Sequence, residues 1–186
     1  MKFRALTLAA AFAGSFLVVA AARGQAGETF TATASVKWKG KTHTAPVRIS
    51  IQEMSSEAER TELMAALKKG THAGKEVLQK MKDRGEIDAG EWKAPIRYAF
   101  ARSTGSGRVL SLVTAQPLLH IGAGLPDSKP KTGYDVAVAI LVLEADGSGH
   151  GEIAPAAKVH MNASGAIVVD DYASAKVWLK GIKKAS

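Results

Sequence analysis

The segment that most restricts the fold covers residues 134–145, because the strand that it predicts is apolar on both faces. Its alternating side chains form two rows, Val136, Val138, Ile140 and Val142 on one face and Ala137, Ala139, Leu141 and Leu143 on the other. A strand of this kind has to be covered on both sides. The two small alanines allow a helix to approach closely, so we expect helices over the face that carries them.

Seven further segments show the period-two alternation of strands that are buried on one face. They are residues 30–38, 45–52, 92–100, 108–116, 153–161, 166–172 and 176–182. Pro95 lies inside the third of these, which indicates an edge position or a bulge. Short turns separate most neighbouring segments, so the sequence predicts an antiparallel meander of about eight strands. Such a meander forms a curved sheet or a small barrel, and the pattern alone does not distinguish these from a sandwich.

Between the second and third predicted strands, the period changes to that of a helix. Ser56 and Glu59 have the spacing of a capping box, and Gly70 ends this first helix. A second helix is predicted over about residues 72–84, with Gly85 as its stop. The apolar stripes are narrow, Leu63, Met64 and Leu67 in the first helix and Val77, Leu78 and Met81 in the second. The predicted class is therefore α+β, mostly β, with an inserted αα-hairpin that packs on a larger body.

The N-terminus has the three regions of an export signal. Lys2 and Arg4 precede a long apolar stretch that ends in three alanines, residues 20–22, which match an A-x-A cleavage site. We expect cleavage after Ala22 and a single globular domain over residues 23–186; an uncleaved anchor is the alternative. Cleavage leaves 23 basic against 17 acidic residues, a net charge of about +6. The chain has no cysteine that could carry a lipid, so we expect a periplasmic or secreted protein.

Three features together resemble uncharacterised exported bacterial proteins. They are the pair of helices, the run GEIAPAAKV over residues 151–159 and the ending VWLKGI over residues 177–182. The similarity covers about the C-terminal two-thirds of the chain. Because no activity is known for that group, the resemblance implies no reaction, ligand or functional residue.

No group of residues has the pattern of a catalytic, cofactor or metal site. His150, Glu152 and His160 are the densest set of metal-ligand types, but the two histidines are about 30 Å apart in an extended strand. Asp170 and Asp171 are adjacent, so their side chains point to opposite faces of a strand. The serines near Gly105 lack the context of a nucleophile elbow. We therefore predict no catalytic residue, no metal and no cofactor.

The expected function is that of a non-catalytic protein of the cell envelope. A small barrel could hold a small apolar ligand, lined by Trp38, Trp92, Tyr98 and Phe100, with His120 at the start of the longest loop. The basic outer faces of the strands are consistent with a charged surface that serves solubility alone, or with binding of an anionic envelope component instead. The aromatic residues fall mostly on inward faces, so no nucleic acid is expected. Two alternative hypotheses are a protein-interaction module that docks through the helical hairpin and an exported hydrolase. No particular protein partner is predicted.

Overall fold

The computed structural model describes residues 27–38, 40–90, 92–118, 131–162, 166–172 and 175–185, and it places only the backbone of Trp38. The predicted export signal therefore lies outside the described residues. Nine strands and two helices follow one another in this order: β1 Glu28–Trp38, β2 Lys41–Ile51, α1 Glu57–Leu67, α2 Thr71–Lys80, β3 Gly85–Asp88, β4 Lys93–Ser103, β5 Gly107–Thr114, β6 Val136–Glu144, β7 Gly149–Met161, β8 Ile167–Tyr172 and β9 Val177–Lys184.

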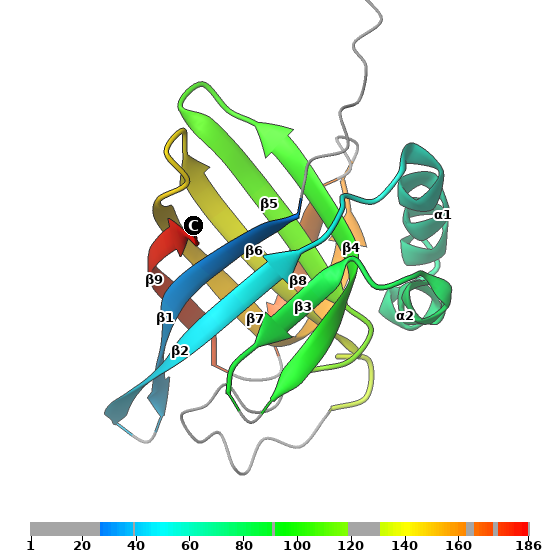
Figure 1. Ribbon diagram of the computed structural model, residues 1–186. Helices are drawn as coiled ribbons and strands as arrows, with labels where there is room; N and C mark the ends of the chain where they lie inside the picture. Colours follow the sequence, from blue (N-terminus) through cyan, green and yellow to red (C-terminus); the bar gives the residue numbers. More distant parts are fainter. Residues whose placement is uncertain are drawn as a thin grey trace, which may run out of the picture.

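Eight of the strands close into an antiparallel barrel (Figure 1). The order is β6-β5-β4-β3-β2-β1-β9-β7, and pairing between β6 and β7 completes the circle. The long β7 pairs with β9 through residues 149–153 and with β8 through residues 157–161, so β8 extends the wall beyond the end of β9. The predicted mostly-β fold with a small barrel and a helical hairpin is confirmed. The four-residue β3 was not predicted.

The barrel separates two apolar clusters. The inner cluster takes side chains from all eight barrel strands, among them Phe30, Ile49 and Leu112. The outer cluster joins Leu63, Leu67 and Leu78 of the helices to the outward side chains of the wall, such as Val138 and Val159. An eight-stranded barrel is just wide enough for its own side chains, and the outer cluster exists because the wall is also apolar where the helices cover it.

The two faces of β6 are both covered, as its sequence requires, but in the opposite sense to our expectation. Ala137 and Ala139 point into the barrel, whereas Val136 and Val138 lie beneath the helices. The physical reason is the limited width of an eight-stranded barrel: small side chains are needed inside, next to Leu110 and Leu112 of β5. On the outer face, Val136 and Val138 pack in the same cluster as Leu63, Leu67 and Leu78 of the helices.

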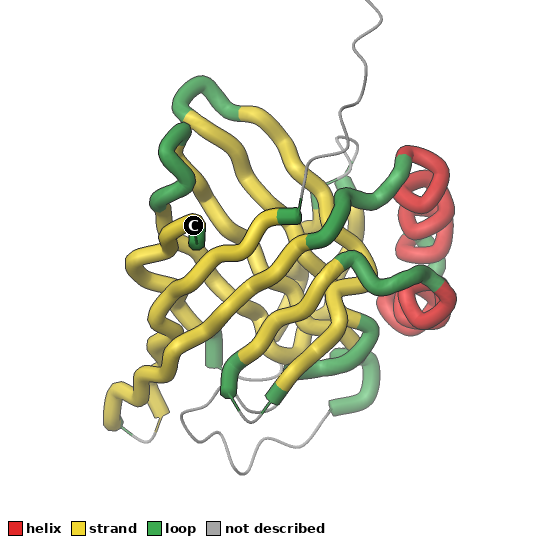
Figure 2. The backbone as a smooth tube through the Cα atoms, in the orientation of Figure 1, coloured by secondary structure: helices red, strands yellow, loops and turns green. Residues whose placement is uncertain are grey.

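The helical hairpin is fixed to one side of the barrel (Figure 2). The side chain of Ser56 caps α1 and forms the predicted capping box with Glu59. The second helix ends at Lys80, four residues before the predicted end, and Gly85 begins β3 instead of stopping the helix. Arg84, only 4% exposed, pairs with Glu53 and with Glu59, which links the segment after α2 to α1. None of the helices in the described part of the chain is long and apolar enough to span a membrane.

Candidate functional site

A bulge in β4 places Tyr98 and Phe100 on the opposite face from Ala94 and Ile96, with which the alternation had grouped them. The register between β4 and β5 shifts between Ile96 and Tyr98. As a result Ile96 points into the barrel, while Tyr98 and Phe100 point outward beneath the helices, with their rings stacked at 6.4 Å between centroids. Burial raises the pKa of Tyr98 to about 12. Both rings belong to the packing between hairpin and wall and do not line the interior.

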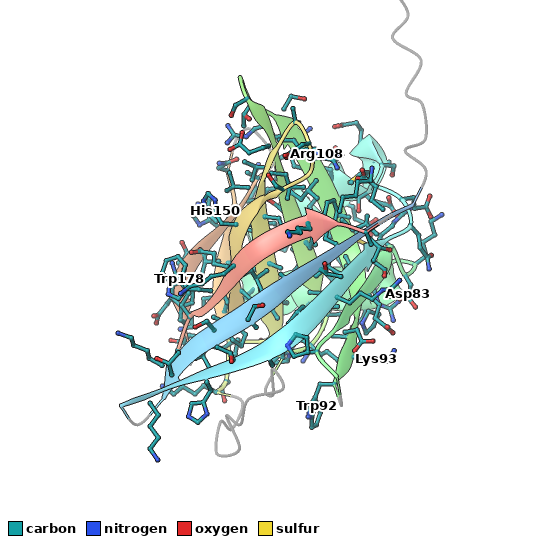
Figure 3. The ribbon with its side chains drawn as sticks, turned by 60° about the vertical axis from the view of Figure 1, so that its left-hand side comes forward. Asp83, Trp92, Lys93, Arg108, His150 and Trp178 are labelled. Carbon is teal, nitrogen blue, oxygen red and sulfur yellow. The ribbon has the colours of Figure 1, made fainter. Side chains whose placement is uncertain are left out.

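Of the other expected lining residues, the structure describes the side chain of Trp92 alone. Trp92 is 47% exposed, in the turn between β3 and β4 at the lower end of the barrel (Figure 3). The side chain of Trp38 and the whole of His120 lie outside the described residues. The interior beside β5 and β6 is filled by side chains, since Leu110, Leu112, Ala139 and Leu141 have no accessible surface. The described core thus leaves no water-sized space next to these four residues.

The outer face of β9 carries the most distinctive surface of the described residues. Alternation and one bulge turn four side chains outward, and we call them the β9 stripe: Lys176, Trp178, Lys180 and Lys183. Val177, Leu179 and Ile182 point inward between them. Gly181 has a φ of 59°, the left-handed region that glycine adopts without strain, and it shifts the phase so that both Lys180 and Lys183 face solvent.

Trp178 is 52% exposed and stands on the outside of the wall (Figure 3). It lies in register with Ser35 of β1 on one side and with Glu152 of β7 on the other. The Nζ atom of Lys176 lies 5.1 Å from the centre of its ring and 5.3 Å from that of Tyr172. The same Nζ atom donates a hydrogen bond of 2.7 Å to Glu152, which raises the pKa of Lys176. These contacts hold the indole in place.

The remaining lysines of this surface have unbalanced charge. Lys180, Lys183 and the neighbouring Lys37 of β1 form no ion pair with any acidic side chain in the described part of the chain. A hollow of about 420 Å³ lies between the indole and two of these cations, Lys37 and Lys180, with Ser35, Thr42, Ala175 and Lys176 as its other lining residues. The hollow can therefore offer two unpaired positive charges, one flat apolar ring and two hydroxyl groups to the same ligand.

A second hollow, of about 580 Å³, lies at the upper mouth of the barrel. Glu28 at the start of β1 is 8% exposed there and accepts hydrogen bonds from Arg108 of β5 and Lys184 of β9. Burial alone would raise the pKa of Glu28, but the hydrogen bonds from these two cations outweigh it and hold the pKa below its ordinary value. We name these three residues the mouth triad. Because the carboxylate of Glu28 pairs with both cations, the triad places hydrogen-bonded charged groups at the barrel mouth, at the edge of the apolar interior.

A third hollow, of about 530 Å³, lies between the α1–α2 turn and β7. Here the hydroxyl of Thr71 donates to the backbone oxygen of Val159 and accepts from its amide, which anchors the hairpin to the wall. His160, which the sequence suggested as a metal-ligand type, pairs with Asp170 at 2.7 Å. Among the described residues no three acidic or histidine side chains are close enough to hold one metal ion.

No family model, no curated protein and no solved structure matches this chain. The alternation of the sequence placed the aromatic side chains mostly inward, and Trp178 was not among the predicted lining residues. The signal that could have found it is the alternation from Lys176 to Lys180: Val177 and Leu179 are aliphatic and face the core, so the residue between them shares the solvent face with two lysines.

Proposed function

We propose that this protein is a non-catalytic component of the cell envelope that binds an anionic ligand on the outer face of β9. The observation that carries the proposal is the position of Trp178, half-exposed on the barrel wall in a hollow that it shares with Lys37 and Lys180, which form no ion pair with any described residue. Exposed large aromatic rings are costly in water, and they are enriched where proteins bind other molecules. The basic balance of the chain favours an acidic partner.

The energetics require both parts of the site. Covering the exposed half of one indole removes on the order of 100 Å² of apolar surface from water, which is worth about 2.5 kcal/mol. That free energy alone corresponds to dissociation constants above about 1 mM. Useful affinity therefore needs Lys37 and Lys180 as well, and it should fall as salt screens their charges.

Two features of the structure favour this site over the alternatives. The packed interior next to Leu112 and Leu141 offers no space there for a small apolar ligand. The exposed face of α1 presents Glu57, Thr61 and Glu62 to solvent, without a large apolar side chain that could anchor a protein partner. In the described part of the chain, only Trp92 and Trp178 are exposed large apolar residues.

The test measures binding of the full-length chain, purified after expression, to three immobilised anions: polygalacturonate, polyglutamate and vesicles that contain an anionic lipid. We expect at least one of them to bind at low salt, and the variant K37Q/K180Q to bind it more weakly. The matched control K69Q/K80Q removes the same charge from the helical hairpin, on the other side of the barrel. Equal losses in both variants, or no binding to any anion, would contradict the proposal.

A further inference from the structure

We propose that the ligand of the β9 stripe is an acidic polysaccharide, a chain of pyranose rings with carboxylate groups, laid along β9. This inference deepens the proposed function and rests on it. Three properties of the surface define the ligand class: a single flat ring, a row of lysines along β9, and threonine hydroxyl groups on the neighbouring strands β1 and β2. Each matches one property of such a polymer.

The ring of Trp178 suits the face of a sugar. One face of a pyranose ring carries mainly C–H bonds, and these pack on the negative face of an aromatic ring. The indole is already held in position by the ammonium group of Lys176, which in turn contacts Tyr172 and Glu152. A ligand therefore orders little at this point when it binds, so less of the interaction free energy is spent on immobilising the side chain.

The cations form a line that follows the strand. Lys176 and Lys180 are four residues apart, about 13 Å in an extended strand, with Trp178 between them. The charge of Lys176 is paired with Glu152, so Lys180 supplies the unpaired charge next to the indole. Lys183 continues the line, because the bulge at Gly181 turns it outward. Lys37 lies beside the line, on β1. A polymer with a carboxylate on successive rings can reach several of these ammonium groups while one of its rings covers the indole.

The neighbouring strands contribute hydroxyl groups. On β1, Thr31 and Thr33 are exposed and lie in register with Lys183 and Lys180. On β2, Thr42 and Thr44 are exposed opposite Lys37 and Ser35. The hydroxyls of these four threonines form no hydrogen bond with other described residues. They can donate to and accept from the hydroxyl groups of a sugar chain.

Other anions match fewer of these features. A lipid bilayer would reward several apolar side chains on one face, whereas Trp178 is the one large apolar side chain exposed on this part of the described wall. Single-stranded nucleic acid stacks successive bases on a series of aromatic rings, and β9 presents one. A sugar polymer can form hydrogen bonds with the threonine hydroxyl groups while one of its rings covers the single indole, which is a closer match than a lipid bilayer or a single-stranded nucleic acid offers.

The test separates charge from ring shape with three polymers. Polygalacturonate has both properties, its fully methyl-esterified form has the rings without the charge, and polyglutamate has the charge without the rings. We expect the full-length chain to bind polygalacturonate roughly tenfold more tightly than either of the others. In W178A the preference over polyglutamate should disappear, whereas in W178F part of it should remain. The control W92A changes the other exposed tryptophan and should keep the full preference.

The outcomes distinguish this inference from the function on which it rests. Equal binding of polyglutamate and polygalacturonate would overturn the polysaccharide inference and leave an anion-binding protein. Binding of anionic vesicles or of a single-stranded oligonucleotide in preference to polygalacturonate would overturn it as well. If no anion binds, both proposals fail. Circular dichroism of W178A and W178F shows whether each variant is folded before its affinity is compared.

Discussion

The mouth triad gives a prediction whose size can be worked out from its geometry. Both carboxylate oxygens of Glu28 accept hydrogen bonds from Arg108 Nη2, at 2.8 and 2.7 Å, and one also accepts from Lys184 Nζ at 2.7 Å. Glu28 is 8% exposed and the side chain of Arg108 is 20% exposed. The change Glu28→Gln keeps the shape of the side chain and removes its charge, which leaves Arg108 without a counter-ion.

The expected loss follows from these exposures. Removing one partner of a fully buried ion pair costs about 3–5 kcal/mol, but Arg108 still reaches solvent. Lys184 is half-exposed and regains its hydration, so its share is small. We therefore expect the free energy of unfolding at pH 7 to fall by about 2–3 kcal/mol, the range of one strong charge-assisted interaction. For a domain of this size, the melting temperature should fall by about 5–10 °C.

The same loss should depend on pH. The folded structure lowers the pKa of Glu28 below its ordinary value of 4.5. The ionised carboxylate therefore stabilises the fold fully above the pKa of the unfolded chain, and this contribution is lost as the pH falls through the lower, folded pKa. The difference between the natural chain and Glu28→Gln should be constant near neutrality and shrink below about pH 4.5.

Urea unfolding at pH 7 and at pH 3, followed by circular dichroism, measures both effects. The second change Arg108→Met should restore part of the stability of Glu28→Gln, because it removes the unpaired charge. The control Glu144→Gln neutralises an exposed carboxylate on the rim of the same hollow and should cost less than about 0.5 kcal/mol. A loss below 0.5 kcal/mol for Glu28→Gln at pH 7, or an equal loss at pH 3, would refute the reasoning.

Three further predictions concern the hairpin, the bulge and the stripe. Leu63 lies on the buried face of α1 and is fully buried. Leu63→Ala leaves a cavity there and should lower the free energy of unfolding by about 2–5 kcal/mol in the same urea assay. Gly181→Ala forces an alanine to a φ of 59° and should cost about 1–2 kcal/mol; Gly181→Asn should cost less, and equal losses would contradict the assignment of strain. Trp178→Ala should leave the unfolding free energy within about 0.5 kcal/mol, because the indole is exposed; a larger loss would mean that it supports the wall.

The strands were predictable because their alternation is regular, but the face of each residue depended on irregularities that alternation does not show. Pro95 indicated a bulge or an edge in β4, yet only the structure shows that the register shift falls between Ile96 and Tyr98. That shift places Tyr98 on the outer face, although the alternation had given it the same phase as Ile96. In β6 the pattern showed two covered faces, and the width of the barrel decided which one was inside.

The candidate site was harder to predict than the fold. Tryptophan is large and mostly apolar, so an alternating pattern with Trp178 in it does not by itself show the solvent face. The positions of the lysines become informative only when β9 is known to lie beside β1, since Lys37 and Ser35 are more than 130 residues away from Trp178 in the sequence. Pairings of this kind depend on how the barrel closes, which no local pattern encodes.

The pairing of the first barrel strand with the last has a consequence for how the chain acquires its structure. β1 pairs with β9, and the amide of Ala185 donates to the carbonyl of Thr29. Until β9 has been made, β1 and β7 keep open edges and the inner cluster lacks Leu179 and Ile182. Contacts between residues this far apart in sequence form late. A nascent chain therefore cannot close the native barrel before β9 has been made, however early its other seven barrel strands are available.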